Sequence, residues 1–171
     1  MADFIKLCKN RYSVRKFSDK KVEEEKINII LSSAQVSPTA CNKQPQKIYV
    51  LQSPEALEKL QKCKTSHFGE TLAFIITVDK TKCWVREYDD QSSSYVDGSI
   101  VTTHMMLAAH DIGIGSTWIM HFIPDAVRSE FSIPENEEII SILVMGYPAP
   151  DSKPSSQHYD KKPLSETVVV L

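Results

Sequence analysis

Hydrophobic residues recur along this chain at spacings that predict helices in some segments and strands in others. The clearest helical stripe has apolar residues at i, i+3, i+4 and i+7, namely Ile27, Ile30, Leu31 and Ala34. Three glutamates at 23–25 precede the stripe and would lie at the positive end of the helix dipole. Pro38 should end this helix at or before Ser37, because proline disfavours helical geometry in the residue before it. A shorter stripe predicts a first helix over residues 3–9.

Short apolar runs rich in β-branched residues predict strands at 47–51, 71–78, 115–119 and 139–146. A helix should begin at Ser53-Pro54, which supplies a cap residue and a first-turn proline, and another should cover 124–131. The longest predicted helix, 96–112, is apolar on both sides. We therefore expect it to be buried, with an inward face made of Ile100, Thr103, Leu107 and Ala108. The polar segments 88–94 and 151–162 predict exposed loops.

The mixture of these elements predicts the fold class. Helices and strands do not alternate strictly, which favours an α+β sandwich around one sheet. Residues 168–171 have pure strand composition, and an exposed apolar strand would invite aggregation unless it docks. The length of 171 residues is about one domain's worth, and the chain has no internal repeat or linker. We therefore predict a single domain over 1–171.

Composition excludes several classes of protein. A net charge of −2 without basic runs argues against a nucleic-acid surface. No apolar run approaches the roughly 20 residues that span a bilayer, and the N-terminus does not resemble a signal peptide. The four cysteines are far apart and form no Cys-x-x-Cys pair, so we expect free thiols in a reducing cytoplasm and no metal site. His104 and His110 are six residues apart and would not share a helix face.

Three polar motifs carry the candidate chemistry. RYSVR at 11–15 places two guanidinium groups around a hydroxyl, and Arg11 and Arg15 would share a face if the segment were helical. Asn42 and Gln44 supply side-chain amides between two prolines. GIGSTWI at 113–119 is a glycine-rich approach to a strand, where backbone N–H groups can contact a ligand. A phosphate, a polyol and a heteroaromatic ring would use all three motifs, and flavin mononucleotide (FMN) has all three parts.

The same motifs resemble those of the nitroreductase family of FMN-dependent oxidoreductases. The similarity continues in order through SPTACNKQP at 37–45, DGSI at 97–100, VMGYP at 144–148 and KKPL at 161–164. It covers nearly the whole chain from about Leu7. The resemblance implies a central, mainly antiparallel sheet flanked by helices, and a homodimer in which the C-terminal strand is exchanged between subunits.

The resemblance also implies which residues contact the flavin. They are Arg11, Tyr12, Ser13, Arg15, Pro38, Thr39, Ala40, Asn42, Gln44, Gly115, Ser116, Trp118, Ile119, Lys161 and Lys162. Residues 38–40 would line the ligand of the neighbouring subunit, and one of the two lysines would add a phosphate contact. A substrate pocket would include Cys41, Met120 and His121, of which the last two place bulk where family members often have small residues.

Each motif also has a structural interpretation. The arginines could be surface cations, and Asn42 and Gln44 could be turn residues beside Pro45. Gly113 is explained by the end of a helix. Cys41 has no local base or orienting partner, which favours a half-buried packing residue over a nucleophile.

The activity implied by the resemblance is transfer of hydride from NAD(P)H through flavin N5 to a small conjugated acceptor, such as a nitroaromatic or a quinone. The flavin would carry the chemistry, so no catalytic side chain is required. The main alternative is a flavin-binding sensor or storage protein without efficient turnover. A cysteine hydrolase that uses Cys41 is a third hypothesis.

Overall fold

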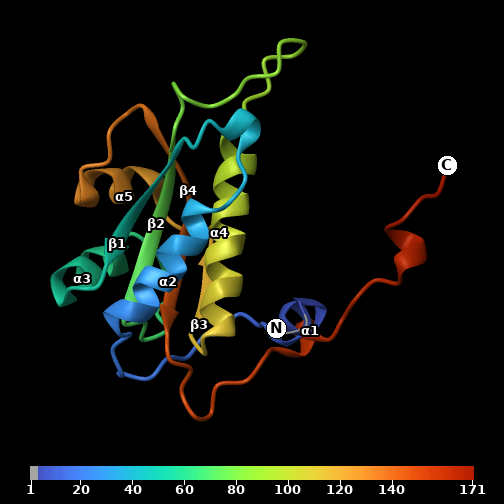
Figure 1. Cartoon of the computed structure of the whole chain (residues 1–171). Helices are drawn as coiled ribbons and strands as arrows, with labels where there is room; N and C mark the ends of the chain where they lie inside the picture. Colours follow the sequence, from blue (N-terminus) through green and yellow to red (C-terminus); the bar gives the residue numbers. More distant parts are fainter. Residues whose placement is uncertain (1–3) are drawn as a thin grey trace.

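The computed structural model describes residues 4–171, in which four antiparallel strands form one sheet covered by helices on both faces (Figure 1). The strands lie in the order β1-β2-β4-β3. Their bounds are β1 (Gln46–Leu51), β2 (Leu72–Asp79), β3 (Gly115–Ile119) and β4 (Glu137–Gly146). The α+β class and the mainly antiparallel sheet predicted from the sequence are confirmed.

The helices begin and end close to where the sequence signals place them. They are α1 (Phe4–Asn10), α2 (Glu24–Gln35), α3 (Pro54–Lys62), α4 (Ser94–Asp111) and α5 (Pro124–Phe131). The Ser53 hydroxyl accepts a hydrogen bond from the Ala56 N–H at 3.1 Å and caps α3. Gly113 has a φ of +79° and ends α4, as its structural interpretation predicted. Position 3 of the first predicted helix lies outside the described residues.

The two faces of the sheet support two separate hydrophobic clusters. Alternate residues of β2 point in opposite directions, so Phe74 and Ile76 join the cluster beneath α2 and α4, whereas Ala73 and Ile75 join the cluster beneath α3 and α5. A register shift between Ile76 and Thr77 interrupts the pairing of β2 with β4. The central strands are thus buried on both sides and form a rigid base for the loops at their ends.

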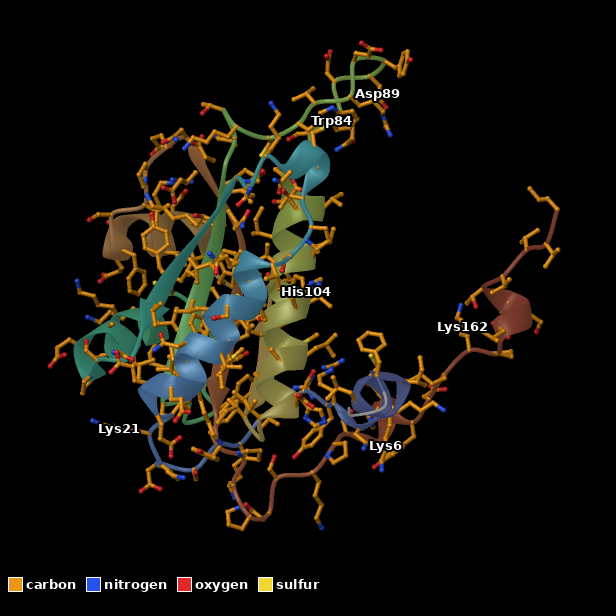
Figure 2. All side chains as sticks on the ribbon, in the orientation of Figure 1. Lys6, Lys21, Trp84, Asp89, His104 and Lys162 are labelled. Atoms are coloured by element: carbon orange, nitrogen blue, oxygen red, sulfur yellow. The ribbon has the colours of Figure 1, made fainter. Side chains whose placement is uncertain are left out.

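The predicted inward face of α4 is wrong. The helix buries Val101, Met105 and Ala109 against the sheet, while Ile100 and Leu107 are only half-buried on the side that faces away from it. Because α4 is apolar on both sides, its sequence does not distinguish the two faces. His104, labelled in Figure 2, lines a shallow hollow of about 240 Å³ on this outer face, together with Ser99, Ile100 and Thr103.

The predicted C-terminal strand is absent from the single chain. Residues 168–171 follow a short 3-10 turn at Leu164–Glu166 and form no strand among the described residues. Their side chains are exposed, with Val169 at 82% and Val170 at 91%. Figure 1 shows the end of the chain running away from the body of the fold past α1. We call residues 162–171 the C-terminal arm. A strand needs a neighbouring strand to pair with, and among residues 4–171 no strand or bridge pairs with these residues.

A buried carboxylate joins the start of β4 to β1 and β2. Glu137 accepts hydrogen bonds from Lys47 Nζ at 2.9 Å, from the Tyr49 hydroxyl at 2.7 Å and from Thr77 Oγ1 at 2.7 Å. Burial raises the pKa of Glu137, but the three hydrogen bonds together lower it by more, so the net shift of the pKa is downward. Burial and the neighbouring carboxylate raise the pKa of Tyr49 to about 12.

This carboxylate should make the stability of the protein pH-dependent. A carboxyl with a lowered folded pKa contributes stability above its unfolded pKa, and that contribution is lost as the pH falls through the folded value. Glu137→Gln should therefore cost about 1–3 kcal/mol near pH 7, and the difference from wild type should shrink below about pH 4. Urea unfolding of both proteins across this range measures it, and a difference that does not change with pH would contradict the expectation.

Candidate functional site

A basic cavity of about 640 Å³ lies between α1 and the segment that precedes the C-terminal arm. Its lining includes Ile5, Cys8, Lys9, Asn10, Arg11, His158, Tyr159 and Lys161. Of the two predicted lysines, Lys161 lines the cavity, whereas Lys162 lies on the exposed arm (Figure 2). Guanidinium, ammonium and imidazole groups are the donors that suit an anionic ligand such as a phosphate.

The RYSVR segment is extended rather than helical, because α1 ends at Asn10. Ser13 forms a parallel bridge with Ser116, and the Val14 N–H donates to the Ser116 carbonyl at 3.0 Å. The Val14 side chain is buried. The segment therefore lies along the edge of β3, which brings the first and third motifs of the sequence side by side.

Gly115 has a packing role at this contact. A Cβ atom there would lie 2.6 Å from Val14 Cγ2 and 3.0 Å from Pro148 Cγ, so the close approach requires glycine. Ser116, the next residue, has a buried hydroxyl with no hydrogen-bond partner among residues 4–171. The indole N–H of Trp118 on the same strand is likewise buried and unpartnered within that range. Buried polar atoms usually have a partner, and a bound ligand is one way to supply it.

A smaller cavity of about 160 Å³ connects the two motifs to the end of α4. It is lined by Tyr12, Val14, His110, Gly113, Ile114, Gly115 and Pro148. Burial and the nearby Arg11 guanidinium lower the pKa of His110. The Tyr12 ring packs edge-on against His158 with centroids 6.4 Å apart, and this contact joins the smaller cavity to the basic one.

The amide-bearing loop, residues 38–45, has an unusual backbone. Cys41, Asn42 and Gln44 all have left-handed φ values, of 50°, 52° and 47°. Such conformations cost on the order of 1–3 kcal/mol each and persist only where the surroundings hold them. Gln44 Nε2 donates to Asn42 Oδ1 at 3.1 Å, and both side chains are exposed. Cys41 is also an exposed free thiol, so its predicted half-buried packing role is wrong for the single chain.

A buried carboxylate, that of Asp97, ties this loop to α4. The sequence alone did not assign it a role. Asp97 is 1% exposed, and its Oδ1 accepts a hydrogen bond from the Ala40 N–H at 2.8 Å. Its Oδ2 accepts from the Ser93 hydroxyl at 2.7 Å. The adjacent Gly98 lets α4 approach β4 closely, because a Cβ there would lie 2.6 Å from Ile140 Cγ1. The spacing of Ser93 and Asp97, at i and i+4, was the signal in the sequence that could have suggested their hydrogen bond.

The candidate substrate residues Met120 and His121 follow β3 and are exposed. His121 Nδ1 lies 3.1 Å from Thr65 Oγ1. Behind this contact, Lys64 and Glu70 form an ion pair of 2.7 Å in which both side chains are fully buried. Burial raises the pKa of Glu70, but the Lys64 ammonium and backbone N–H groups together lower it by more, so the net shift of the pKa is downward. The Thr65 contact therefore ties His121 to the residue next to this buried ion pair.

Breaking this ion pair should destabilise the protein strongly. Lys64→Met would leave the Glu70 carboxylate buried without its partner, and we expect a loss of about 3 kcal/mol in urea unfolding at neutral pH. Lys16→Met removes a lysine from an ion pair with Asp151 whose side chains are 62% and 65% exposed. That control should cost no more than about 1 kcal/mol. Equal losses in the two variants would show that burial of the first pair has no energetic consequence.

The predicted site residues gather at two ends of α4 rather than at one place. Arg11 lies beside His110 near the end of the helix, whereas Ala40 is bound to Asp97 near its start. Asp97 and His110 are 13 residues apart on the helix (110 − 97), which corresponds to about 20 Å along its axis. Figure 1 shows α1 and the turn at Ala40–Asn42 at opposite ends of α4. Within one chain, the phosphate-type and amide-type groups do not meet.

Among residues 4–171, no group of three or more His, Cys, Asp or Glu side chains is arranged to share a metal ion. Over the same range, no helix has the length and apolar character needed to cross a membrane.

The chain is similar to known proteins over most of its length. The model of the nitroreductase family matches residues 8–68 and 60–147. A protein of Archaeoglobus fulgidus provisionally named NADH dehydrogenase/NAD(P)H nitroreductase is 33% identical, over 86% of this chain and 87% of the relative.

Solved structures show the same similarity. A nitroreductase family protein from Clostridium difficile 630 is 42% identical, with a TM-score of 0.92 over 98% of this chain and 97% of that one. An FMN-dependent nitroreductase from Clostridium difficile R20291 is 28% identical, with a TM-score of 0.74 over 89% of this chain and 91% of that one.

Proposed function

This chain belongs to the nitroreductase family, and on that premise we propose that it is an FMN-dependent NAD(P)H oxidoreductase. Its acceptor would be a small conjugated electrophile, such as a nitroaromatic or a quinone. The observation that carries the proposal is the contact between the RYSVR segment and β3 beside a cavity lined by Arg11 and Lys161. A nitroreductase 28% identical to this chain is described as FMN-dependent.

The residues at this cavity fit the phosphate and polyol of FMN. Arg11 and Lys161 supply positive charge at the cavity, and Ser13, two residues after Arg11, would supply a hydroxyl from the same segment. The buried Ser116 hydroxyl, which has no partner among the described residues, could bond to the polyol. Arg11 would hold the phosphate through two parallel N–H donors, which is the geometry that guanidinium groups offer.

The amide loop fits the edge of the flavin ring. Carboxamides of Asn42 and Gln44 offer both donors and acceptors, and they match the N–H and carbonyl groups of the ring. Bound FMN would supply the hydride and electron transfer of the proposed reaction, so the side chains of this protein would be needed to bind and orient the flavin and the substrates and to exclude water. This division of work explains why the proposed function names no catalytic residue.

The separation of the two groups supports a homodimeric site. Arg11 and the amide loop are at opposite ends of α4, so one flavin would use Arg11 of one subunit and the loop of a second copy. The outer face of α4, with Ile100 and Leu107 half-buried, is an apolar surface suited to a second copy. A dimer that packs these faces together would bring the two halves of each site into one place.

The C-terminal arm supports the same arrangement. Among the described strands, β1 pairs with β2 on one side and with no strand on the other, whereas β3 is flanked by the Ser13 bridge. The apolar residues 168–171 have the composition of a strand and lack a neighbour in their own chain. We propose that they pair with the open edge of β1 in the second subunit.

A flavin-binding sensor or storage protein is the alternative that the bulk at Met120 and His121 suggested. Both side chains are exposed in the single chain, so this position does not by itself favour that alternative. One domain over 1–171, a cytoplasmic location and the lack of nucleic-acid partners stay predictions from the sequence.

Turnover tests the proposed activity. Purified protein reconstituted with FMN should oxidise NADH or NADPH when a nitroaromatic or a quinone is added, and much more slowly without the acceptor. Acceptor-dependent oxidation that disappears when FMN is omitted would support the proposal. A flavin-loaded protein that oxidises neither nucleotide with any of these acceptors would favour the sensor or storage alternative.

A further inference from the structure

We propose that Asp97 is a positioning residue that holds the amide loop in the shape needed for flavin binding. The inference rests on the proposed function, because that function gives the loop its ligand. It concerns a residue that would not touch the flavin itself. Its carboxylate acts through the Ala40 backbone and, through that, on Asn42 and Gln44.

The two oxygens of Asp97 have different partners. Oδ2 accepts from the Ser93 hydroxyl, and the Asp97 N–H donates to the Ser93 carbonyl at 2.8 Å, so this side of the residue belongs to the first turn of α4. Oδ1 accepts from the Ala40 N–H, which belongs to the loop. The helical and the loop contacts of one carboxylate can therefore be separated by substitution.

The Ala40 contact precedes all three left-handed residues. Beyond it, the loop is held by local hydrogen bonds of 3.0 Å, from Asn42 N–H to the Thr39 carbonyl, from Lys43 N–H to the Ala40 carbonyl and from Gln44 N–H to Thr39 Oγ1. The far end is fixed where the Asp79 N–H donates to the Pro45 carbonyl at 2.8 Å. A loop pinned at both ends can keep strained φ values, whereas release of one end lets Cys41, Asn42 and Gln44 relax.

The position of Asp97 suits a side chain that accepts hydrogen bonds. It lies in the first turn of α4, and both of its oxygens accept hydrogen bonds. Gly98 keeps this turn close to β4, so the carboxylate is fixed relative to the sheet. One side chain, that of Asp97, thus holds the amide loop in a fixed position relative to the core of the fold.

Thr102 provides a matched control on the same helix. It is fully buried, and its hydroxyl donates to the Gly98 carbonyl at 2.7 Å and lies 2.9 Å from Ser141 Oγ. Like Asp97, it makes two side-chain hydrogen bonds inside the protein, but their partners, Gly98 and Ser141, lie outside residues 38–45. Thr102→Val should therefore reduce stability without changing the loop.

The test compares Asp97→Ala, Asp97→Asn, Ser93→Ala and Thr102→Val in the full chain. Amide hydrogen exchange of residues 40–44 is measured without FMN, the dissociation constant of FMN by fluorescence quenching, and stability by urea unfolding. Asp97→Ala should speed exchange in the loop and weaken FMN binding at least about tenfold. Asp97→Asn should restore most of both, because its amide oxygen can still accept from Ala40. Ser93→Ala should leave the loop nearly unchanged.

Two results would overturn the positioning role. One is loop exchange and FMN affinity in Asp97→Ala that equal those of wild type. The other is an equal effect of Thr102→Val on both quantities, which would assign the change to general destabilisation. A wild-type protein that does not bind FMN would instead overturn the proposed function, while the exchange comparison would still decide whether Asp97 holds the loop.

Discussion

Removal of residues 168–171 is expected to weaken the proposed dimer by about a thousandfold and to weaken FMN binding with it. The four side chains are exposed in the single chain, and burial of one Val or Leu side chain is worth roughly 1.5–3 kcal/mol. Part of this gain is offset by the ordering of the arm, so about 4 kcal/mol is a reasonable net loss. Sedimentation velocity at several protein concentrations measures the shift from dimer to monomer.

The truncation has two informative controls. Val169→Ser with Val170→Ser keeps the backbone of the arm and should give an intermediate loss, because strand pairing remains while side-chain burial does not. Ile123→Ser removes a 56% exposed apolar residue beside α5, on the face of the sheet opposite α4, and should leave the dimer intact. A truncated protein that remains dimeric with unchanged affinity would refute the exchange of the C-terminal strand.

Substitution of Arg11 by alanine is expected to weaken FMN binding by about two to three orders of magnitude, with little change in stability. Arg11 is the guanidinium that lines the basic cavity, and hydrogen bonds to charged groups are worth about 1.5–3 kcal/mol each. Arg11→Lys should recover only part of the loss, since an ammonium cannot make two parallel bonds to one phosphate. Fluorescence titration with FMN measures all three affinities.

Arg86→Ala is the matched control for this prediction. Arg86 forms an exposed ion pair of 2.5 Å with Asp89 in the loop that precedes α4, far along the chain from the cavity. Its loss should leave the FMN affinity within about twofold of wild type. Riboflavin, which lacks the phosphate, should bind wild type and Arg11→Ala with similar affinity. Equal FMN affinity for wild type and Arg11→Ala would remove Arg11 from the phosphate site.

The secondary structure could be predicted where local patterns decide it. The strand at 115–119 and the helix at 124–131 have the predicted bounds, because the strand-forming run, Pro124 and nearby turn signals act over a few residues. The inward face of α4 was wrong, and the exchanged C-terminal strand stays a prediction, for one common reason. Both depend on which surface lies opposite, and the composition of residues 168–171 or of an all-round apolar helix does not name that surface.

The candidate site was predictable in part for the same reason. Sequence motifs predicted the residue types for phosphate and ring, and the structure brings the RYSVR segment to β3 and Lys161 to Arg11. The sequence did not predict the long-range contacts that hold the loops of the site. Asp97 binds a residue 57 positions away, and Lys64 bridges to Phe122, so these contacts are set by the topology of the sheet and not by local spacing.

The most direct test is an anaerobic visible spectrum of the purified, FMN-loaded protein before and after addition of NADH and then NADPH. The proposed function predicts oxidised flavin absorption that bleaches within seconds with at least one of the two nucleotides, which also identifies the electron donor. Protein that remains colourless after incubation with FMN, or bound flavin that stays oxidised with both nucleotides, would contradict an FMN-dependent NAD(P)H oxidoreductase.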